Sequence, residues 1–236
     1  MKFTITSLNL QGYDYWDARV PHILKYLRAT HPDVICFQEV VYLPPVSAYS
    51  QVDVLNKELG FAHQFSDITR LQVGLVYPVY REGLAALSRH QVVKTETIIL
   101  KQAEGDQHNR IVQLLDVQPT NGPLIKIANV HFSVTDIVDY ATPQLEEILE
   151  ILKARNEKRI LIGDFNLVSL DESSVLWRDD YTATIKSSYI SYPKMNKRID
   201  YALVPNEYSI ESISVSGDDL SDHRALTVTI EIPDFI

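Results

Sequence analysis

Cysteine is almost absent from this sequence, since Cys36 is the only one among 236 residues. A single cysteine excludes an intramolecular disulfide and any zinc site built from several thiolates. The chain also lacks an apolar run of the roughly 18 residues that a membrane-spanning helix requires. Residues 1–9 alternate apolar and polar side chains and contain no signal-peptide core. These features predict a cytoplasmic protein, although a mature secreted form without its leader would look the same.

Positive charge is scarce as well. Lysine and arginine total 22 against 31 aspartate and glutamate residues, which gives a formal net charge of −9. Proteins that coat nucleic acid need a broadly basic surface, so the composition argues against that class. An enzyme that contacts a few phosphates through a local basic patch and a metal ion is compatible with this charge.

The chain contains no internal repeat, low-complexity tract or flexible linker. We therefore expect one catalytic domain over residues 1–236, acting as a monomer. Strand-like segments recur along it. They cover residues 2–9, 33–38, 83–89, 92–100, 110–118, 124–131, 159–163, 198–204, 209–216 and 224–232.

Helical spacing of apolar residues predicts two long helices. The first has Asp17 as its N-cap and Pro21 in its first turn, and the second has Thr142 as its N-cap and Pro143 at its first position. A shorter helix is expected over residues 50–59. Strands and helices in this order predict two packed sheets with helices outside them, rather than a doubly wound parallel sheet. Long loops are expected at residues 40–49, 101–109 and 186–197.

Most residues able to do chemistry fall at the ends of these predicted strands. They are Asn9, Gln38, Glu39, Asn129, His131, Asp164, Asn166, Asp200, Asp222 and His223. Strand ends that share one edge of a two-sheet fold converge, so residues far apart in the sequence can form one site. Their recurrence at one kind of position therefore predicts a single functional centre.

The residue types at this predicted centre suit phosphate chemistry. Glu39, Asp222 and the carbonyl oxygen of Asn9 are hard ligands for Mg²⁺ or Mn²⁺, and such a cation polarises a phosphoryl oxygen. His223 can transfer a proton when a carboxylate fixes its tautomer, and Asp200 is the candidate partner.

The nucleophile is predicted to be water. Asp164 could position the attacking water, and Asn166 could donate a hydrogen bond to a phosphate oxygen. No serine or cysteine lies in a nucleophile-elbow context, which favours direct attack by water over a covalent intermediate.

Seven short motifs, in this order, resemble those of the endonuclease/exonuclease/phosphatase superfamily of metal-dependent phosphohydrolases. They are Leu8-Asn9, Phe37-Gln38-Glu39, Glu82-Gly83-Leu84, Asn129-Val130-His131, Gly163-Asp164-Phe165-Asn166, Arg198-Ile199-Asp200-Tyr201 and Ser221-Asp222-His223. The resemblance implies an α/β (α+β) fold, a four-layered α/β/β/α sandwich with two packed mixed β-sheets. It also implies hydrolysis of a phosphate ester by a metal-assisted water.

The resemblance further implies a role for each matching residue. Glu39 would hold the metal with support from Asn9 and Asp222. Asp200 would buttress His223. Asp164 and Asn166 would align the nucleophile and the phosphate.

Two further residues resemble those of one branch of the family. Glu82 and His131 look like the second carboxylate–histidine pair of pancreatic-type deoxyribonucleases. Apurinic-site repair nucleases tend instead to have tyrosine at the position of His131 and lysine after the metal-binding glutamate, where this chain has Val40. Arg110 resembles an arginine that contacts the substrate phosphate.

Structural roles remain open for several of these residues. Asn9 could cap a turn, Asp164 and Asn166 could form an Asx-turn, and His131 could be a core histidine. Glu82 and Arg110 could belong to surface ion pairs. The other histidines have no companion motif and are interpreted as structural or solvated, and they are His22, His31, His63, His90 and His108.

The segment 188–198 favours a nuclease among the phosphoesterases. It has three positive charges, Lys194, Lys197 and Arg198, and two tyrosines that include Tyr192. Lysines there could bind backbone phosphates and a tyrosine could stack on a base, with DNA or RNA as the substrate.

Other functions stay open. A phosphomonoesterase acting on a phosphoinositide, sugar phosphate or nucleotide is the main enzymatic alternative. A lipid phosphodiesterase is less favoured, with the apolar segment 42–46 as its only candidate wedge. A binding module on the same scaffold without catalysis is the alternative from another class.

Overall fold

A computed structural model describes residues 1–42, 49–72, 80–134 and 138–233. The strands form two six-stranded sheets. The first has the order β11 (Ser209–Val215), β12 (Leu226–Glu231), β1 (Lys2–Asn9), β2 (Val34–Tyr42), β4 (Tyr80–Ser88) and β3 (His63–Gln72). The second has the order β5 (Gln91–Ile99), β6 (Ile111–Gln118), β7 (Ile125–His131), β8 (Ile160–Asp164), β10 (Asp200–Pro205) and β9 (Tyr181–Ala183). Both sheets are mixed, because β1–β2 and β7–β8 are parallel pairs among antiparallel ones.

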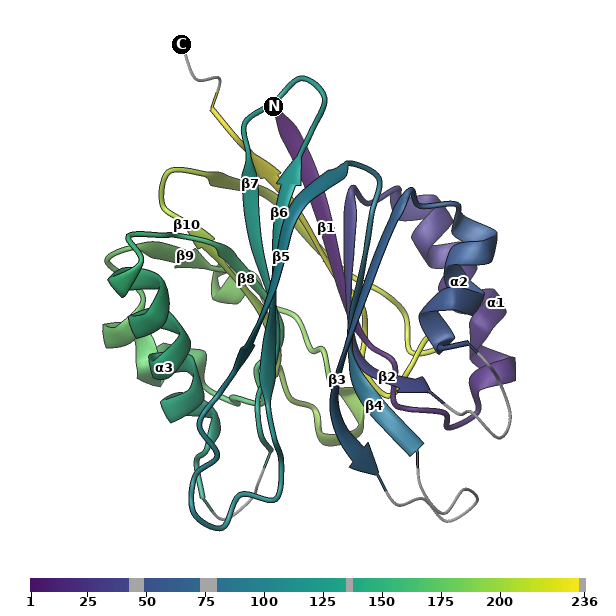
Figure 1. Ribbon diagram of the computed structural model, residues 1–236, viewed down its shortest axis with the longest axis horizontal. Coiled ribbons are helices and arrows are strands. Elements are labelled where there is room, and N and C mark those ends of the chain that lie inside the picture. Colours follow the sequence, from purple (N-terminus) through teal and green to yellow (C-terminus); the bar gives the residue numbers. More distant parts are fainter. Residues whose placement is uncertain (43–48, 73–79, 135–137, 234–236) are drawn as a thin grey trace.

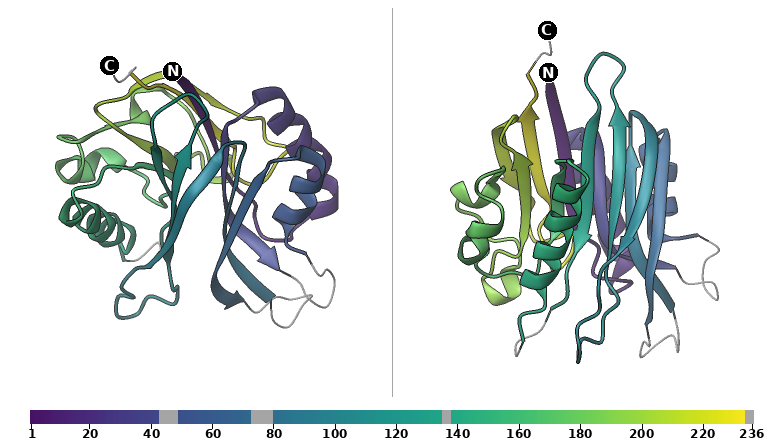
Figure 2. Two further views of the ribbon diagram at one scale, coloured as in Figure 1. Left: turned by 45° about the horizontal axis from the view of Figure 1, so that its top comes forward. Right: turned by 60° about the vertical axis from the view of Figure 1, so that its left-hand side comes forward.

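Helices cover the two outer faces of these sheets. The first sheet carries α1 (Trp16–Thr30) and α2 (Gln51–Leu59), and the second carries α3 (Ala141–Ala154). Figures 1 and 2 show α1 and α2 on one side of the molecule and α3 on the other. Three short 3₁₀ helices complete the described elements: η1 (Leu170–Leu176), η2 (Thr184–Lys186) and η3 (Pro193–Met195). The four-layered α/β/β/α sandwich predicted from the sequence is confirmed.

Alternating side chains of the two sheets fill the central core. Phe3, Ile5 and Cys36 of the first sheet pack against the second, where Leu115 and Ile127 are fully buried. Successive side chains of a strand point to opposite faces, so each inner strand also supplies residues to the core under its helices. Cys36 is a buried core residue, as its apolar surroundings in the sequence predict. No helix in the described part of the chain is long and apolar enough to cross a membrane.

Both long helices begin earlier than the sequence predicts. The α1 helix begins at Trp16, so Asp17 lies in its first turn and Pro21 lies beyond that turn. The Arg19 guanidinium stabilises the N-terminal end of the helix by donating hydrogen bonds to the carbonyl oxygens of Gly12 and Asp14, at 3.3 and 2.7 Å. A side chain farther along the helix therefore satisfies the preceding backbone, which a search for N-cap residues cannot find.

The α3 helix begins at Ala141, so Thr142 is not its N-cap and Pro143 is its third residue. The carboxylate of Asp139 accepts the backbone N–H of Thr142 at 3.0 Å and satisfies one of the free donors of the first turn. The shorter helix is confirmed as α2, where Ser50 and Asp53 form a capping box.

Strand β3 was not predicted from the sequence. It is an edge strand with polar side chains on both faces, so it lacks the apolar alternation that identifies a strand. Strand β2 continues to Tyr42 and shortens the loop expected at residues 40–49, of which 43–48 lie outside the described residues. The candidate lipid wedge therefore also lies outside them, apart from Tyr42.

Gly163 lets strands β7 and β8 approach each other directly beside Asp164. Its φ is +151°, and a Cβ atom there would lie 2.0 Å from the carbonyl oxygen of Val130. Replacement by alanine is therefore expected to destabilise the fold by about 3 kcal/mol or more. Chemical denaturation measures this loss. Gly217→Ala is the matched control, because the nearest atom is a side-chain oxygen of Asp219 at 3.4 Å. Equal stabilities of the two variants would contradict this account.

Candidate active site

The ends of several inner strands meet at the end of the sandwich opposite the two termini (Figure 1). Asn9 ends β1, His131 ends β7 and Asp164 ends β8, while Asp200 begins β10. Hydrogen bonds link the sheets here, since the Asn9 amide nitrogen donates to Asp164 at 3.0 Å and to Glu39 at 3.2 Å. Residues from both sheets therefore form one polar cluster at this edge.

A β-bulge directs Glu39 toward this cluster. The pairing of β2 with β4 shifts register between Phe37 and Val40, and Glu39 has a φ of +53°. A left-handed conformation is unfavourable for a residue with a Cβ atom, by about 1 kcal/mol or more. Bulges re-aim side chains beside functional sites, and here the bulge turns a strand carboxylate onto Asn9.

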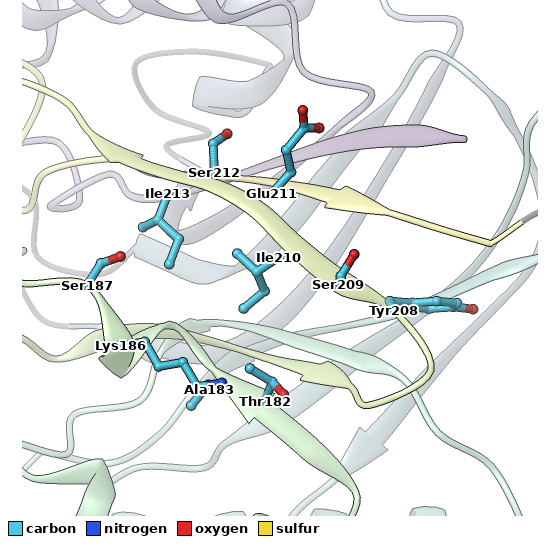
Figure 3. A pocket seen from close by; sticks show the side chains of 10 residues that line it. All are labelled: Thr182, Ala183, Lys186, Ser187, Tyr208, Ser209, Ile210, Glu211, Ser212 and Ile213. Atoms are coloured by element: carbon cyan, nitrogen blue, oxygen red, sulfur yellow. The ribbon is translucent and has the colours of Figure 1, made fainter.

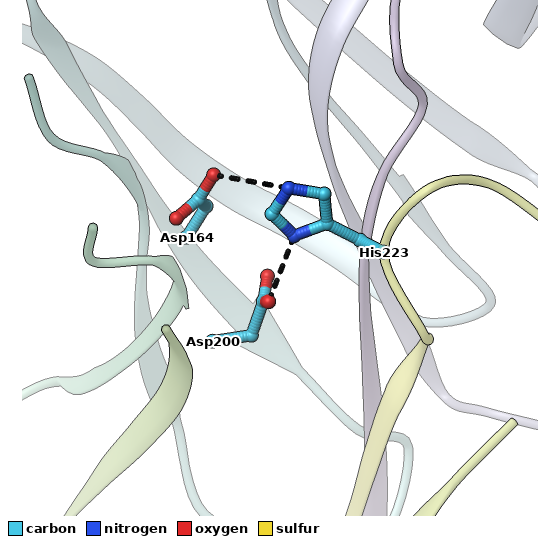
Figure 4. Close-up of side chains that lie close together, drawn as sticks. All are labelled: Asp164, Asp200 and His223. Atoms are coloured by element: carbon cyan, nitrogen blue, oxygen red, sulfur yellow. Dashed lines mark hydrogen bonds and ion pairs between the residues drawn. The ribbon is translucent and has the colours of Figure 1, made fainter. Parts of the chain in front are cut away.

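One oxygen of Asp164 is the meeting point of the site. Asp164 Oδ2 lies 3.5 Å from His131 Nε2 and 3.9 Å from His223 Nε2, and it accepts the Asn9 amide. The other ring nitrogen of His223 bonds to Asp200 Oδ2 at 2.9 Å (Figure 4). All of these side chains are almost completely buried, whereas Glu39 is partly exposed. Two histidines and a carboxylate thus face the same small volume, from the ends of β7 and β8 and from the loop before β12.

Asn9 and Asp164 each also hold a local turn. The side-chain oxygen of Asn9 accepts the backbone N–H of Gln11 at 2.9 Å, and Asp164 Oδ1 accepts the backbone N–H of Asn166 at 3.0 Å. The Asn166 amide donates to the carbonyl oxygen of Phe132 at 2.9 Å. The turn-forming roles left open by the sequence are therefore present, and they fix the orientation of the atoms that face the site.

The two histidines differ in protonation state at neutral pH. Burial alone would lower the pKa of His223, but the carboxylates of Asp200 and Asp164 outweigh it and raise that pKa to about 10. Burial, together with the guanidinium groups of Arg110 and Arg70, holds the pKa of His131 well below its ordinary value. His223 is consequently a cation and a proton donor, whereas His131 is neutral.

Oxygen donors at the open side of the cluster fit a hard divalent cation. Burial raises the pKa of Glu39, and the nearby carboxylates of Glu82 and Asp222 add to the effect. A cation would relieve this crowding of negative charge, and carboxylate oxygens are the ligands that Mg²⁺ and Mn²⁺ prefer. Deeper inside, ligand atoms of Asp164, Asp200 and His223 lie within 4.8 Å of one another and could also hold a metal.

The expected pairing of Glu82 with His131 is not what the structure has. Glu82 instead accepts from Arg70, whose Nε and Nη2 lie 3.0 and 2.9 Å from Glu82 Oε1. His131 faces Asp164 and, at 4.0 Å, Glu39. Arg70 comes from β3, the strand that the sequence did not reveal, so this competing partner could not be foreseen. Arg110 lies close enough to Glu39, Glu82 and Asp164 to interact electrostatically with all three.

The segment 186–197 brings Tyr192 to the site. Its ring lies 4.9 Å from the ring of His223, at an angle of 44°. Lys194 is exposed on the adjoining 3₁₀ turn, and Lys197 pairs through its backbone with Tyr192. Arg198 is not part of a basic rim, because it donates to the carbonyl oxygens of Ile185 and Ser187. Its guanidinium also lies over the rings of two tyrosines, Tyr189 and Tyr201.

Sequence reasoning missed the residues that hold this site in place. The hydroxyl of Ser191 accepts the backbone N–H groups of Ile199 and Asp200, both at 3.0 Å. The side chain of Gln11 accepts the backbone N–H of Asp222 at 3.0 Å. Both residues lie in loops and bind backbone N–H groups. Neither their residue type nor a position at a strand end could therefore identify them from the sequence.

A separate hollow lies between η2 and β11, in the region drawn in Figure 3. Its lining includes Lys186, Tyr208 and Ile210 but none of the predicted site residues. Glu211 at its border is bound by Lys2, so its charge is already paired. The residues able to do phosphate chemistry therefore gather around Asp164 and not in this hollow.

Known proteins share this architecture. A sequence profile of the endonuclease/exonuclease/phosphatase family matches residues 6–223, whereas no curated protein matches significantly. An endonuclease/exonuclease/phosphatase from Beutenbergia cavernae DSM 12333 superposes with a TM-score of 0.80 and 19% identity, covering 98% of this chain and 72% of that one.

Two other solved structures carry more specific names. TDP2 from D. rerio, in a complex with a single-strand DNA product, has a TM-score of 0.72 and 20% identity, covering 98% of this chain and 99% of that one. A mannosyl-6-phosphatase from Bacteroides thetaiotaomicron VPI-5482 has a TM-score of 0.70 and 15% identity, covering 98% and 100%. At these identities the likeness establishes a common fold.

Proposed function

Since the chain belongs to the endonuclease/exonuclease/phosphatase family, we propose that it is a divalent-metal-dependent phosphodiesterase that uses water as its nucleophile. The activities in the family name share hydrolysis of a phosphate-ester bond. The observation that carries the proposal is the convergence of His131, His223 and Asn9 on one oxygen of Asp164. Participation of both sheets in this site supports a single catalytic domain over residues 1–236.

Glu39 is the proposed principal ligand of Mg²⁺ or Mn²⁺, with Asp222 as a second carboxylate. Asn9 supports them by holding Glu39 and Asp164 in place, since its amide nitrogen rather than its oxygen faces these carboxylates. When bound, the cation would polarise a phosphoryl oxygen and offset the negative charge of the transition state.

The protein's own groups then divide the remaining work. Asp164 orients the attacking water and accepts its proton. His223, kept protonated by Asp200 and Asp164, donates to a phosphate oxygen or to the leaving group. Neutral His131 has one unprotonated ring nitrogen, so it can accept a proton beside Asp164.

Arg110 and Asn166 are assigned to binding of the substrate phosphate. Asn166 has one amide N–H bonded to Phe132, which leaves its second for a phosphate oxygen. The Arg110 guanidinium is buried and lies electrostatically close to Asp164 and Glu39.

Within the phosphodiesterases we favour a nuclease acting on DNA or RNA. Tyr192 beside His223 offers an aromatic face to a nucleobase, and Lys194 and Lys197 lie on the same short segment. The similar fold of TDP2, solved with a single-strand DNA product, agrees with this choice. The pancreatic-type branch stays a prediction that rests on His131 alone, because Glu82 pairs with Arg70.

A substrate panel tests this proposal. Single- and double-stranded DNA and RNA are each incubated with Mg²⁺ or Mn²⁺, beside a phosphoinositide, a sugar phosphate and a nucleotide. Cleavage of a nucleic acid that is abolished by chelation is the expected result. Turnover of a phosphomonoester alone would contradict the phosphodiesterase assignment, and no turnover by well-folded protein would favour a binding module.

A further inference from the structure

A second group of side chains, two arginines and a histidine, lies beside the catalytic carboxylates and joins the two sheets. Arg70 belongs to β3 of the first sheet, and His108 lies in the loop before β6 of the second. The Arg70 guanidinium bonds to Nδ1 of His108 through Nη1 and to Glu82 through its other two nitrogens. Nδ1 therefore acts as an acceptor, and the ring carries its proton on Nε2, where it is a donor.

Arg110 adds a second guanidinium with few protein partners. Only 3% of the residue is exposed, and the one hydrogen bond of its guanidinium to described residues joins Nε to Ser133 Oγ at 3.4 Å. Burial and the adjacent Arg70 lower the pKa of Arg110 to about 10. A buried charge needs a counter-charge, and Glu82 is already bonded to Arg70. Among the described residues no carboxylate forms an ion pair with Arg110, and its charge is balanced only at longer range by Glu82, Asp164 and Glu39.

A buried polar network fixes this group of side chains before any ligand binds. Ser133 Oγ donates to Asp106 at 2.7 Å and accepts from the Gln144 amide at 3.0 Å. Asp106 also accepts the backbone N–H of His108 at 2.9 Å. The loop of His108 and the side chain of Arg110 are thus anchored to one point, which is the arrangement expected of a preorganised binding site.

We propose that Arg70, His108 and Arg110 bind a second phosphate group of the substrate, next to the phosphate that is hydrolysed. Two guanidinium groups and an imidazole N–H match the acceptors of a phosphate, and the guanidinium groups are opposite to it in charge. Arg110 interacts electrostatically with both Glu82 and Asp164, so its guanidinium could contact the reacting phosphate as well as the second one. The inference rests on the proposed function for the position of the reacting phosphate.

This second phosphate has two sources with the same chemistry. It is either the neighbouring phosphate of a polynucleotide or a terminal phosphate of a small bisphosphate. Both place a second anion close to the scissile bond, whereas a simple monoester or an isolated diester does not. The substrate class is therefore a phosphate ester that carries a further phosphate group.

Phosphate binding without catalysis is the first part of the test. Inorganic phosphate is titrated calorimetrically into protein in EDTA, which suppresses metal-dependent turnover. The double variant Arg70→Gln/Glu82→Gln removes an ion pair without leaving a buried charge alone, and His108→Gln changes a half-buried loop residue. Each is expected to weaken phosphate binding about tenfold or more. Arg155→Gln, which removes an exposed ion pair with Glu96, is the control and should not change it.

Kinetics with paired substrates is the second part. A dinucleotide with a terminal phosphate is compared with the same dinucleotide lacking it, and a sugar bisphosphate with its monophosphate. The second phosphate should lower KM about tenfold in the wild type with little change in kcat, and the double variant should lose this advantage. The pair that shows the advantage identifies the source of the phosphate.

The two proposals fail in different ways. Hydrolysis with no effect of the variants on phosphate affinity, and no advantage of a second phosphate, would overturn the second site alone. Phosphate binding that depends on Arg70 and His108, without hydrolysis of any ester, would instead overturn the proposed function and leave the second site standing.

Discussion

Replacing Glu39 with glutamine is expected to lower metal-dependent phosphodiester turnover by about three orders of magnitude. The substitution keeps the shape of the side chain but removes the charge that would bind the cation. Loss of several kcal/mol of charge stabilisation at the phosphoryl group corresponds to roughly a thousandfold in rate. Steady-state rates at increasing Mg²⁺ measure the effect, and excess metal should not restore the wild-type rate.

The Glu39 variant should fold at least as well as the wild type in the absence of metal. Burial and neighbouring carboxylates already raise the pKa of Glu39, which shows that its charge is unfavourable there. Denaturation in EDTA measures this. Added Mg²⁺ should then stabilise the wild type and have little effect on the variant. Equal stabilisation of both proteins by Mg²⁺ would place the metal elsewhere.

Replacing His223 with alanine is expected to reduce turnover by roughly two to four orders of magnitude, the usual contribution of a positioned proton donor. His223 is hydrogen-bonded to Asp200 at 2.9 Å and is protonated at neutral pH, since its pKa is raised to about 10. A group with a raised pKa acts as an acid below that value and loses its proton above it. The alkaline limb of the wild-type pH–rate profile should therefore lie near pH 10 and disappear in the variant.

His90→Ala provides a matched control for this substitution. His90 also bonds to an aspartate, with Nε2 at 2.8 Å from Asp33 Oδ1, but it lies at the other end of β4 beside the core residue Phe3. Its loss removes a histidine–aspartate pair without touching the strand-end cluster. Turnover close to the wild-type value is expected for this variant. Similar losses in both variants would indicate a general structural effect rather than proton transfer by His223.

The inner strands could be read from the sequence because they are buried on both faces and rich in β-branched residues. The predicted strand ends for Asn9, His131 and Asp164 agree with the structure, and this placement was enough to gather them at one site. Strand β3 has polar residues on both faces because it lies at an edge, so no periodicity revealed it. Arg70 could therefore not be connected with Glu82.

Local backbone geometry was also beyond the reach of the sequence. The bulge at Glu39 depends on how β2 pairs with β4, which lie far apart in the chain. For Asn9 and Asp164 the sequence left two roles open, holding a local turn or taking part in the site. Each side chain does both, because one of its polar atoms bonds to the turn and the other faces the site. The catalytic roles stay predictions, and the structure supplies the distances on which they rest.

Hydrolysis of a phosphodiester at one metal-centred site around Glu39 and Asp164 can be tested directly. The most direct measurement is the rate of product release from a DNA or RNA oligonucleotide carrying a terminal phosphate, with Mg²⁺ present or chelated. We expect cleavage that requires Mg²⁺ and falls about a thousandfold in Glu39→Gln. Cleavage that persists in EDTA, or an unchanged rate for Glu39→Gln, would contradict this expectation.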